Sequence, residues 1–232
     1  RLIKLKFDLI KISSGLSNNF PLLREAIKSK IPLIISTGMS NKQDLIELKL
    51  FLNKFNFNKI VILKCVSTYP TNLKEINLKT FLTLKKIFNY NIGYSDHSLG
   101  NIACISAVSL GACVLEKHFT LNKKLIGADH KISLEPKEFK EMVIKVREAE
   151  KVLGKENKML SLKLSKLRKY NFRYLTSLNK INKNEKFSLN NISFKRQKKT
   201  SGLLPKFFFK IEGKKAKRNI KKNTLIKFSD VK

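Results

Sequence analysis

The sequence predicts an α/β fold with a parallel sheet, and three patterns support this prediction. Short apolar runs alternate with longer amphipathic segments, the pair recurs five times at a spacing of roughly 25 residues, and each apolar run ends in polar side chains. Five such units are too few to close an eight-stranded barrel, whereas an open doubly wound sheet can be built from five. Periodicity alone therefore leaves both architectures open.

The five apolar runs are expected to be strands, and the amphipathic segments are expected to be helices. The strands are predicted at Asp8–Ser13, Pro32–Ser36, Lys59–Cys65, Asn91–Ser95 and Cys113–Phe119. The helices are predicted at Phe20–Lys30, Lys42–Phe55, Asn77–Phe88, Asn101–Leu110 and Pro136–Leu153. Proline suits the first turn of a helix and glycine suits the position after its end, so Pro136 and Gly154 mark both ends of the last helix.

The character of the chain changes after Gly154. Residues 160–232 contain short β-like runs, namely FRYLTSL, FSLNNISF, FFFKIEG and NTLIKF, and two similar lysine-rich turn patterns, INKNEKFS and IKKNTLIK. We therefore expect a first domain at residues 1–154, a basic linker at residues 155–169 and a small β-rich domain at residues 170–232.

The net charge of +32 raises the possibility of nucleic-acid binding, but the kind of basic residue argues against it. The chain has 42 lysines and only seven arginines, whereas arginine is the usual residue for bidentate phosphate and guanine contacts. Residues 1–150 carry 24 basic and 13 acidic groups, and residues 151–232 carry 25 and 4. We expect a solvated lysine surface, and we keep a basic nucleic-acid-binding protein as an alternative.

Two further features concern the location of the protein. There is no run of 18 apolar residues, so no membrane span is predicted. The three cysteines are Cys65, Cys104 and Cys113, and they form no CxxC pair, which predicts reduced thiols in a cytoplasmic protein. The chain begins with Arg1 and not with methionine, so we expect it to be a fragment.

Two of the three histidines end consecutive predicted strands: His97 and His118. Neighbouring strands lie about 4.8 Å apart, so two imidazoles at adjacent strand ends can share one divalent ion, with water and substrate oxygens as the other ligands. Asp96 is a candidate to orient an imidazole. In the alternative interpretation, His97 caps the next helix and His118 is a hydrogen-bonded core residue.

Lysine and serine side chains collect at the same strand ends. These are Lys11, Ser14, Ser36, Ser67 and Ser95. Ligands of βα folds bind at this edge, and lysine with several hydroxyl groups suits a phosphate or a carboxylate. The alternative is that the serines are ordinary turn and N-cap residues. The chain has no GxxxxGK[ST] loop and no GxGxxG motif, so a nucleotide is not indicated.

At these residues the chain resembles the N-acetylneuraminate (sialic acid) synthase family, with its legionaminate and pseudaminate relatives. The matching motifs are KISSGLSNNFPLL, IISTGMS, LKCVSTYPT, GYSDHSLG, GACVLEKHFTL and DHKISLEPKEF, in the order of the family. They span Lys11 to Leu153. The tail resembles the antifreeze-like (SAF) domain of the family at NNISFKR and GKKAKRNIKKNTLIK.

The resemblance implies a (β/α)8 TIM barrel followed by the small SAF domain, working as a domain-swapped homodimer. Aligned in this way, the five predicted strands correspond to barrel strands four to eight, so the chain is expected to lack the first three βα units and to be inactive alone. An inactive fragment of such an enzyme is the alternative reading of the same resemblance.

The family condenses phosphoenolpyruvate with an N-acylhexosamine such as N-acetylmannosamine, giving a nonulosonic acid and phosphate. By residue-wise correspondence, His97 and His118 hold the metal, expected to be Mn²⁺ or Mg²⁺. The resemblance assigns phosphoenolpyruvate binding to the lysine and the four serines named above. It assigns sugar binding to Tyr69, Asp129 and Arg196, with Arg196 reaching into the site of the partner subunit.

The chain departs from the family pattern at four positions. Leu16 replaces a usual acidic residue that contacts the sugar, and Ala128 replaces a usual proline. Gln197 stands where proline is usual. Lys64 stands where histidine is frequent, and we expect it to add positive charge beside the phosphate site.

Overall fold

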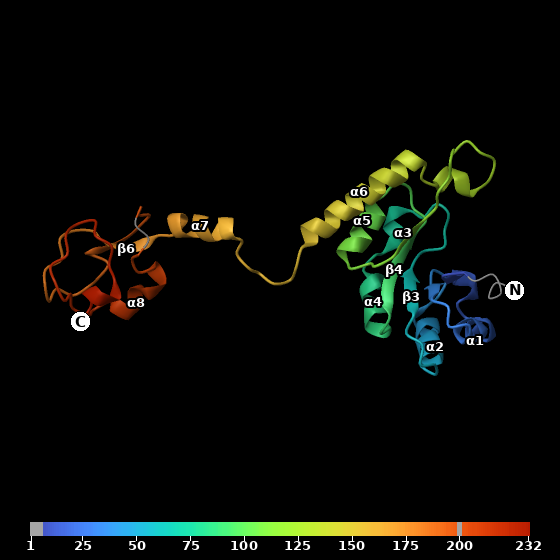
Figure 1. Cartoon of the computed structure of the whole chain (residues 1–232), viewed down its shortest axis with the longest axis horizontal. Helices are drawn as coiled ribbons and strands as arrows, with labels where there is room; N and C mark the ends of the chain where they lie inside the picture. Colours follow the sequence, from blue (N-terminus) through green and yellow to red (C-terminus); the bar gives the residue numbers. More distant parts are fainter. Residues whose placement is uncertain (1–6, 199–200) are drawn as a thin grey trace. The chain divides into compact units, whose positions relative to one another are not determined.

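The structure is a computed structural model that describes residues 7–198 and 201–232. The chain divides into two compact units, unit 1 at Arg1–Gly154 and unit 2 at Lys155–Lys232 (Figure 1). Each unit has its own buried apolar core. In the described part of the chain, no helix combines the length and the apolar character needed to cross a bilayer.

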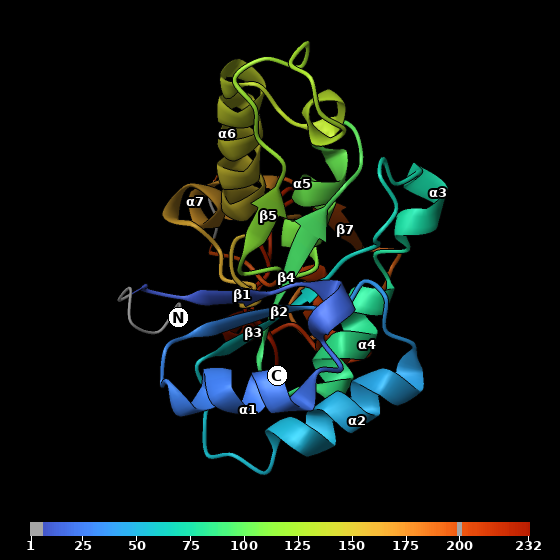
Figure 2. The ribbon, with the colours of Figure 1, turned by 90° about the vertical axis from the view of Figure 1, so that its right-hand side faces the viewer.

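Unit 1 is built on a five-stranded parallel sheet. The strands are β1 (Ile10–Ile12), β2 (Leu33–Ser36), β3 (Ile60–Lys64), β4 (Asn91–Asp96) and β5 (Leu115–Lys117). They follow one another in the sheet in chain order, each paired in parallel with the next. A doubly wound sheet reverses its strand order, so this order excludes that alternative. The sheet curls strongly from β1 to β5, as a segment of a barrel wall does (Figure 2).

The helices of unit 1 connect these strands. They are α1 (Phe20–Lys28), α2 (Lys42–Leu52), α3 (Leu73–Ile76), α4 (Thr80–Ile87), α5 (Ile102–Ser109) and α6 (Pro136–Leu153). Helices α1 and α2 lie side by side, with the Phe20 and Phe51 rings stacked at 4.5 Å (Figure 2). The prediction of five strands and five long helices is confirmed, with ends shifted by up to three residues; the one-turn helix α3 was not predicted.

The core of unit 1 explains why these segments are strands and helices. Alternate strand residues such as Ile35 and Ile62 are fully buried, as are Leu23 and Leu48 on the helices. The parallel strands thus carry apolar side chains against the helices, as expected for this class of sheet. The same packing fixes the carboxyl ends of all five strands at one edge.

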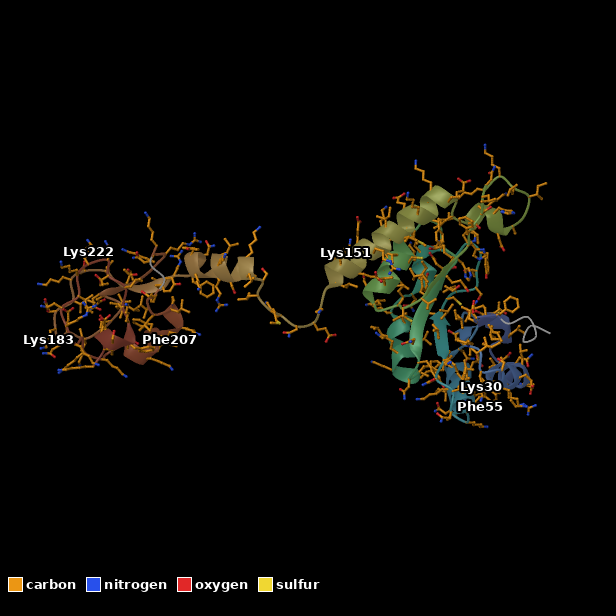
Figure 3. All side chains as sticks on the ribbon, in the orientation of Figure 1. Lys30, Phe55, Lys151, Lys183, Phe207 and Lys222 are labelled. Atoms are coloured by element: carbon orange, nitrogen blue, oxygen red, sulfur yellow. The ribbon has the colours of Figure 1, made fainter. Side chains whose placement is uncertain are left out.

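Unit 2 is a small domain with little regular sheet. It contains α7 (Leu162–Asn171), the antiparallel pair β6 (Tyr174–Ser177) and β7 (Ile192–Lys195), and α8 (Phe208–Ile211). Isolated bridges such as Ile181–Ile220 join the remaining extended segments. The side chains of Lys183 and Lys222 are exposed on its surface (Figure 3).

One expectation for the tail is wrong. The run FFFKIEG is predicted to be β-like, but Pro205–Phe207 form a 3₁₀ turn that continues into α8. Proline starts this helical segment, and Phe208 and Ile211, three residues apart, are both buried in the core of unit 2. Part of the segment expected to be a linker is helical, because Ser161 caps α7 by accepting a hydrogen bond from the backbone N–H of Leu164. Its role as a linker stays a prediction.

Candidate functional site

The carboxyl ends of the five strands surround one cavity of about 360 Å³. Residues from every strand end or the loop after it contribute to its lining: Lys11, Ser14, Ser36, Cys65, Ser67, Tyr69, Ser95, His97, Glu116 and His118, with Ser13, Gly15 and Met39. The structure therefore brings together all five predicted anion-binding residues and both predicted metal ligands.

The loops after β1, β2 and β3 pack closely at the wall of this cavity. The Ser14 hydroxyl accepts a hydrogen bond from the Gly38 N–H at 2.9 Å and lies 3.2 Å from the Cys65 thiol. A Cβ added to Gly38 would lie 2.5 Å from both Cys65 Sγ and Ser67 Oγ. Glycine is therefore required at this position by close approach of neighbouring side chains, and its backbone N–H is held at the site.

An acidic residue that the sequence analysis missed organises the opposite wall. Glu116 forms an ion pair with Lys11 at 3.0 Å and accepts a 2.7 Å hydrogen bond from the Ser95 hydroxyl. Ser95 and Glu116 are register partners on β4 and β5. Glu116 precedes His118 by two residues, and this strand alternation is the signal that could have placed it in the site.

Ser36 has an unusual environment. Its side chain is 2% exposed, and its Oγ is the one fully buried side-chain nitrogen or oxygen atom, among those of the described residues, that has no hydrogen-bond partner. Leaving a buried hydroxyl without a partner costs about 1–3 kcal/mol. Ser36 is among the residues that line the cavity, so a ligand bound there can supply the missing partner.

Three aromatic rings gather at the side of the cavity formed by β3, β4 and β5. The His97 and His118 ring centroids are 5.3 Å apart, and Tyr69 lies 4.2 Å from His97 and 5.6 Å from His118. Both imidazoles line one cavity, as the shared-ion hypothesis requires.

One nitrogen of His97 is already occupied, since Nδ1 lies 2.6 Å from the Val66 carbonyl oxygen. This contact fixes Nδ1 as the protonated donor in the neutral ring and leaves Nε2 with a free lone pair. Desolvation by burial lowers the pKa of His97 below its usual value, which favours that neutral ring. The Nδ1 of His118 lies 3.8 Å from the Asp129 carboxylate, so the predicted sugar-binding Asp129 is beside the histidine pair.

Asp96 does not orient an imidazole, contrary to our expectation. Its carboxylate accepts hydrogen bonds from Lys117 Nζ at 2.8 Å and from the backbone N–H and the hydroxyl of Ser98 at 2.9 and 2.7 Å. Successive strand residues point to opposite faces, so Asp96 faces helix α5 while Ser95 faces the cavity. The Val66 carbonyl takes the role that we had assigned to Asp96.

The expectation for Lys64 is also wrong. Its side chain does not line the cavity with the serines; it lines a second cavity between the sheet and helices α2 and α4. The alternation of β3 again explains the difference, because Cys65 reaches the first cavity and Lys64 points away from it. Leu16, where the family usually has an acidic residue, is 43% exposed.

Arg196 belongs to unit 2, where it directly follows β7 and is exposed.

The third histidine, His130, lies outside the first cavity, and its Nδ1 is 2.7 Å from the Thr120 hydroxyl. Within residues 7–198 and 201–232 there is no cluster of three or more His, Cys, Asp or Glu side chains that could hold a metal ion.

Comparison with known proteins agrees with this architecture. Residues 1–158 match the model of the NeuB family, and residues 172–232 match that of the SAF domain. The chain is 40% identical over 227 residues to a pseudaminic acid synthase of Campylobacter jejuni, covering 97% of this chain and 65% of that protein. An N,N'-diacetyllegionaminic acid synthase of the same organism is 37% identical over 226 residues, covering 97% and 67%.

A solved structure is similar as well. The N-acetylneuraminic acid synthetase of Leptospira borgpetersenii, crystallised with citrate, superposes with a TM-score of 0.68 at 32% identity, covering 72% of this chain and 58% of that one. The chain spans about two thirds of the length of the curated relatives that it matches. Whether it lacks a preceding segment stays a prediction, because relatives do not say where this protein begins.

Proposed function

Because the chain belongs to the NeuB family, we propose that it forms the condensing site of a nonulosonic acid synthase, which joins phosphoenolpyruvate to an N-acylhexosamine. In this reaction C3 of phosphoenolpyruvate bonds to the aldehyde carbon of the sugar, water adds at C2, and the C2–O bond to the phosphate breaks. The products are a nine-carbon keto acid and inorganic phosphate. The free thiols of Cys65, Cys104 and Cys113 fit the cytoplasmic location that we propose.

The observation that carries this proposal is the unpartnered Ser36 hydroxyl in a cavity lined by a lysine and five serines. A small dianion or trianion such as phosphoenolpyruvate offers the oxygen acceptors that this site lacks. In the proposed complex, Lys11 supplies the point charge, and Ser14, Ser67 and Ser95 supply directed donors with Ser36. Glu116 now holds Lys11 and Ser95, so the ligand has to take over those two donors.

The histidine pair fits a divalent ion, which we propose to be Mn²⁺ or Mg²⁺. His97 and His118 line the same cavity, and the Nδ1 of His97 is engaged by a backbone oxygen, which directs Nε2 as its ligand atom. When bound, such an ion supplies Lewis-acid polarisation of the sugar aldehyde. His97 and His118 also hold Tyr69 in ring contact beside them.

Tyr69 and Asp129 are proposed to contact the sugar, since both lie next to the histidines at the cavity. Arg196 is proposed to complete the sugar site from unit 2 of a partner subunit in a domain-swapped homodimer. A guanidinium is suited to this role because it presents several donors in a fixed plane to sugar oxygens.

The function is tested by incubating the full chain with phosphoenolpyruvate, Mn²⁺ and a panel of N-acylhexosamines that includes N-acetylmannosamine. We expect phosphate release that depends on the sugar, together with a nine-carbon product in the mass spectrum. With ¹⁸O in the bridging position of phosphoenolpyruvate, the label should leave in the phosphate. Phosphate release that does not depend on the sugar would contradict the proposal.

A further inference from the structure

A second cavity of about 360 Å³ lies between the sheet and the N-terminal ends of helices α2 and α4. Its lining comprises Thr37, Gly38, Ser40, Lys42, Leu45, Lys64, Cys65, Val66, Glu75, Asn77, Thr80, Thr83 and Leu84. Cys65 is the one residue that it shares with the first cavity. The proposed function assigns no role to this space.

The feature that distinguishes this cavity is a buried cation. Lys64 is 7% exposed, and its ammonium group donates one hydrogen bond, to the carbonyl oxygen of Cys65 at 3.0 Å. No carboxylate of the described residues lies within 4.0 Å of it. Burial lowers the pKa of Lys64, because desolvation penalises the charged form. A buried ammonium group is normally paired, so Lys64 lacks a counter-ion.

Lys117 provides an internal comparison. Its side chain is 1% exposed, and it pairs with Asp96 at 2.8 Å and also donates to the carbonyl of Ser98. Two lysines are thus buried at the strand ends: Lys117 is paired with a carboxylate, whereas Lys64 lines a cavity. The contrast suggests that the counter-charge of Lys64 comes from a ligand.

The rest of the lining decides what kind of ligand fits. Thr37 and Thr80 already donate their hydroxyl protons to backbone carbonyls. The Lys42 ammonium group and the Thr83 hydroxyl form no hydrogen bond or ion pair within the described part of the chain, and remain as donors. Lys42 is also the first residue of helix α2, whose N-terminal end is capped by Asn41 and Asp44, so the attraction for an anion comes from the lysines and the Thr83 hydroxyl.

One acidic residue, Glu75, also lines the cavity. It is exposed and forms no ion pair with Lys64 within 4.0 Å. Two lysines against one exposed carboxylate leave a net positive lining. We propose that this cavity is a second anion site, separate from the phosphoenolpyruvate site, and that it takes a small oxyanion such as inorganic phosphate.

The two cavities are connected through Cys65. Its carbonyl accepts the hydrogen bond from Lys64, and its thiol contacts the Ser14 hydroxyl in the first cavity. An anion bound to Lys64 competes for the ammonium group that now holds this carbonyl. Phosphate in the second cavity therefore alters the position of Cys65, and through it the affinity of the first cavity for its ligand.

The test is titration of the full chain with inorganic phosphate, followed by calorimetry and ³¹P NMR. The wild-type chain should bind two phosphates. Lys64→Met should remove one, and Lys11→Met should remove the other. A chain that binds one phosphate, lost in Lys11→Met and unchanged in Lys64→Met, would overturn the inference.

The exposed Lys42 offers a variant whose folding is not in question. Lys42→Ala should lower the affinity of the Lys64-dependent site for phosphate several-fold and leave the affinity of the Lys11-dependent site unchanged. A variant that binds both phosphates as tightly as the wild type would count against the proposal. This test is independent of the proposed condensation. Phosphate binding at the Lys64-dependent site can be measured even if phosphoenolpyruvate does not bind in the first cavity.

Discussion

Lys117 and Asp96 are register partners on β5 and β4, and their side chains form a 2.8 Å ion pair that is almost fully buried, at 1% and 0% exposure. Each residue immediately precedes a histidine of the site, and strand alternation puts the pair on the opposite face of the sheet. The preceding rung carries Ser95 and Glu116, bonded to each other on the cavity face. The last two register pairs of β4 and β5 are therefore each joined by a polar side-chain contact, one on each face of the sheet.

The first prediction concerns this buried ion pair. Lys117→Met leaves Asp96 charged and buried without its cation, which should lower the free energy of unfolding by about 3–5 kcal/mol. Lys64→Met is the matched control, because it removes a buried lysine that has no carboxylate partner, and it should leave stability unchanged or raised. Urea unfolding of both variants measures the difference; equal losses would mean that Asp96 does not depend on Lys117.

The second prediction concerns Gly38. Gly38→Ala places a Cβ against Cys65 Sγ and Ser67 Oγ, so the wall of the first cavity must shift and phosphoenolpyruvate affinity should fall by at least tenfold. Gly15→Ala is the control in the same lining, because the nearest atom to its added Cβ is 4.0 Å away. Calorimetry with phosphoenolpyruvate should separate the two; similar affinity in both variants would show that the close packing is not needed.

The third prediction concerns the proposed ion. His97→Ala and His118→Ala should each abolish the binding of one Mn²⁺ per chain, as measured by electron paramagnetic resonance without any substrate. His130→Ala is the control, because His130 lies outside the first cavity. Wild-type Mn²⁺ binding in either cavity variant would refute the assignment of the pair.

The fourth prediction concerns Arg196 and the partner subunit. Arg196→Ala should raise the sugar KM or lower kcat while phosphoenolpyruvate binding stays nearly unchanged. Mixing equal amounts of Arg196→Ala and His97→Ala chains should recover about a quarter of the wild-type activity, because half of the randomly formed dimers are mixed and each contains one intact site of two. A mixture without recovered activity would argue against the proposal that Arg196 completes the site of the partner subunit.

Much of unit 1 could be predicted from the sequence, because its strands are short apolar runs and its helices have clear end signals. Helix α6 begins at Pro136 and ends at Leu153, as predicted. Side chains at strand ends are harder to predict, since position along the chain does not show which face of the sheet each one occupies. Strand alternation explains why Asp96 does not orient an imidazole, why Lys64 does not lie beside the serines, and why Glu116 does line the cavity.

Unit 2 was less predictable for a different reason. Aromatic and β-branched residues favour strands on average, yet Phe208 and Ile211 form one face of a short helix that is fixed by packing. Helix α7 buries none of its residues, so its sequence lacks the amphipathic pattern that would have revealed it. In both segments, tertiary contacts or a single cap decide the local structure.

The central claim is that the first cavity binds phosphoenolpyruvate, and Ser36→Ala tests it most directly. Because the Ser36 hydroxyl is buried without a partner in the free protein, its removal should leave the melting temperature unchanged or raise it. The same change removes a donor to a charged ligand, so phosphoenolpyruvate affinity should fall about ten- to a hundredfold by calorimetry. A variant that melts lower and binds phosphoenolpyruvate as tightly as the wild type would contradict the account.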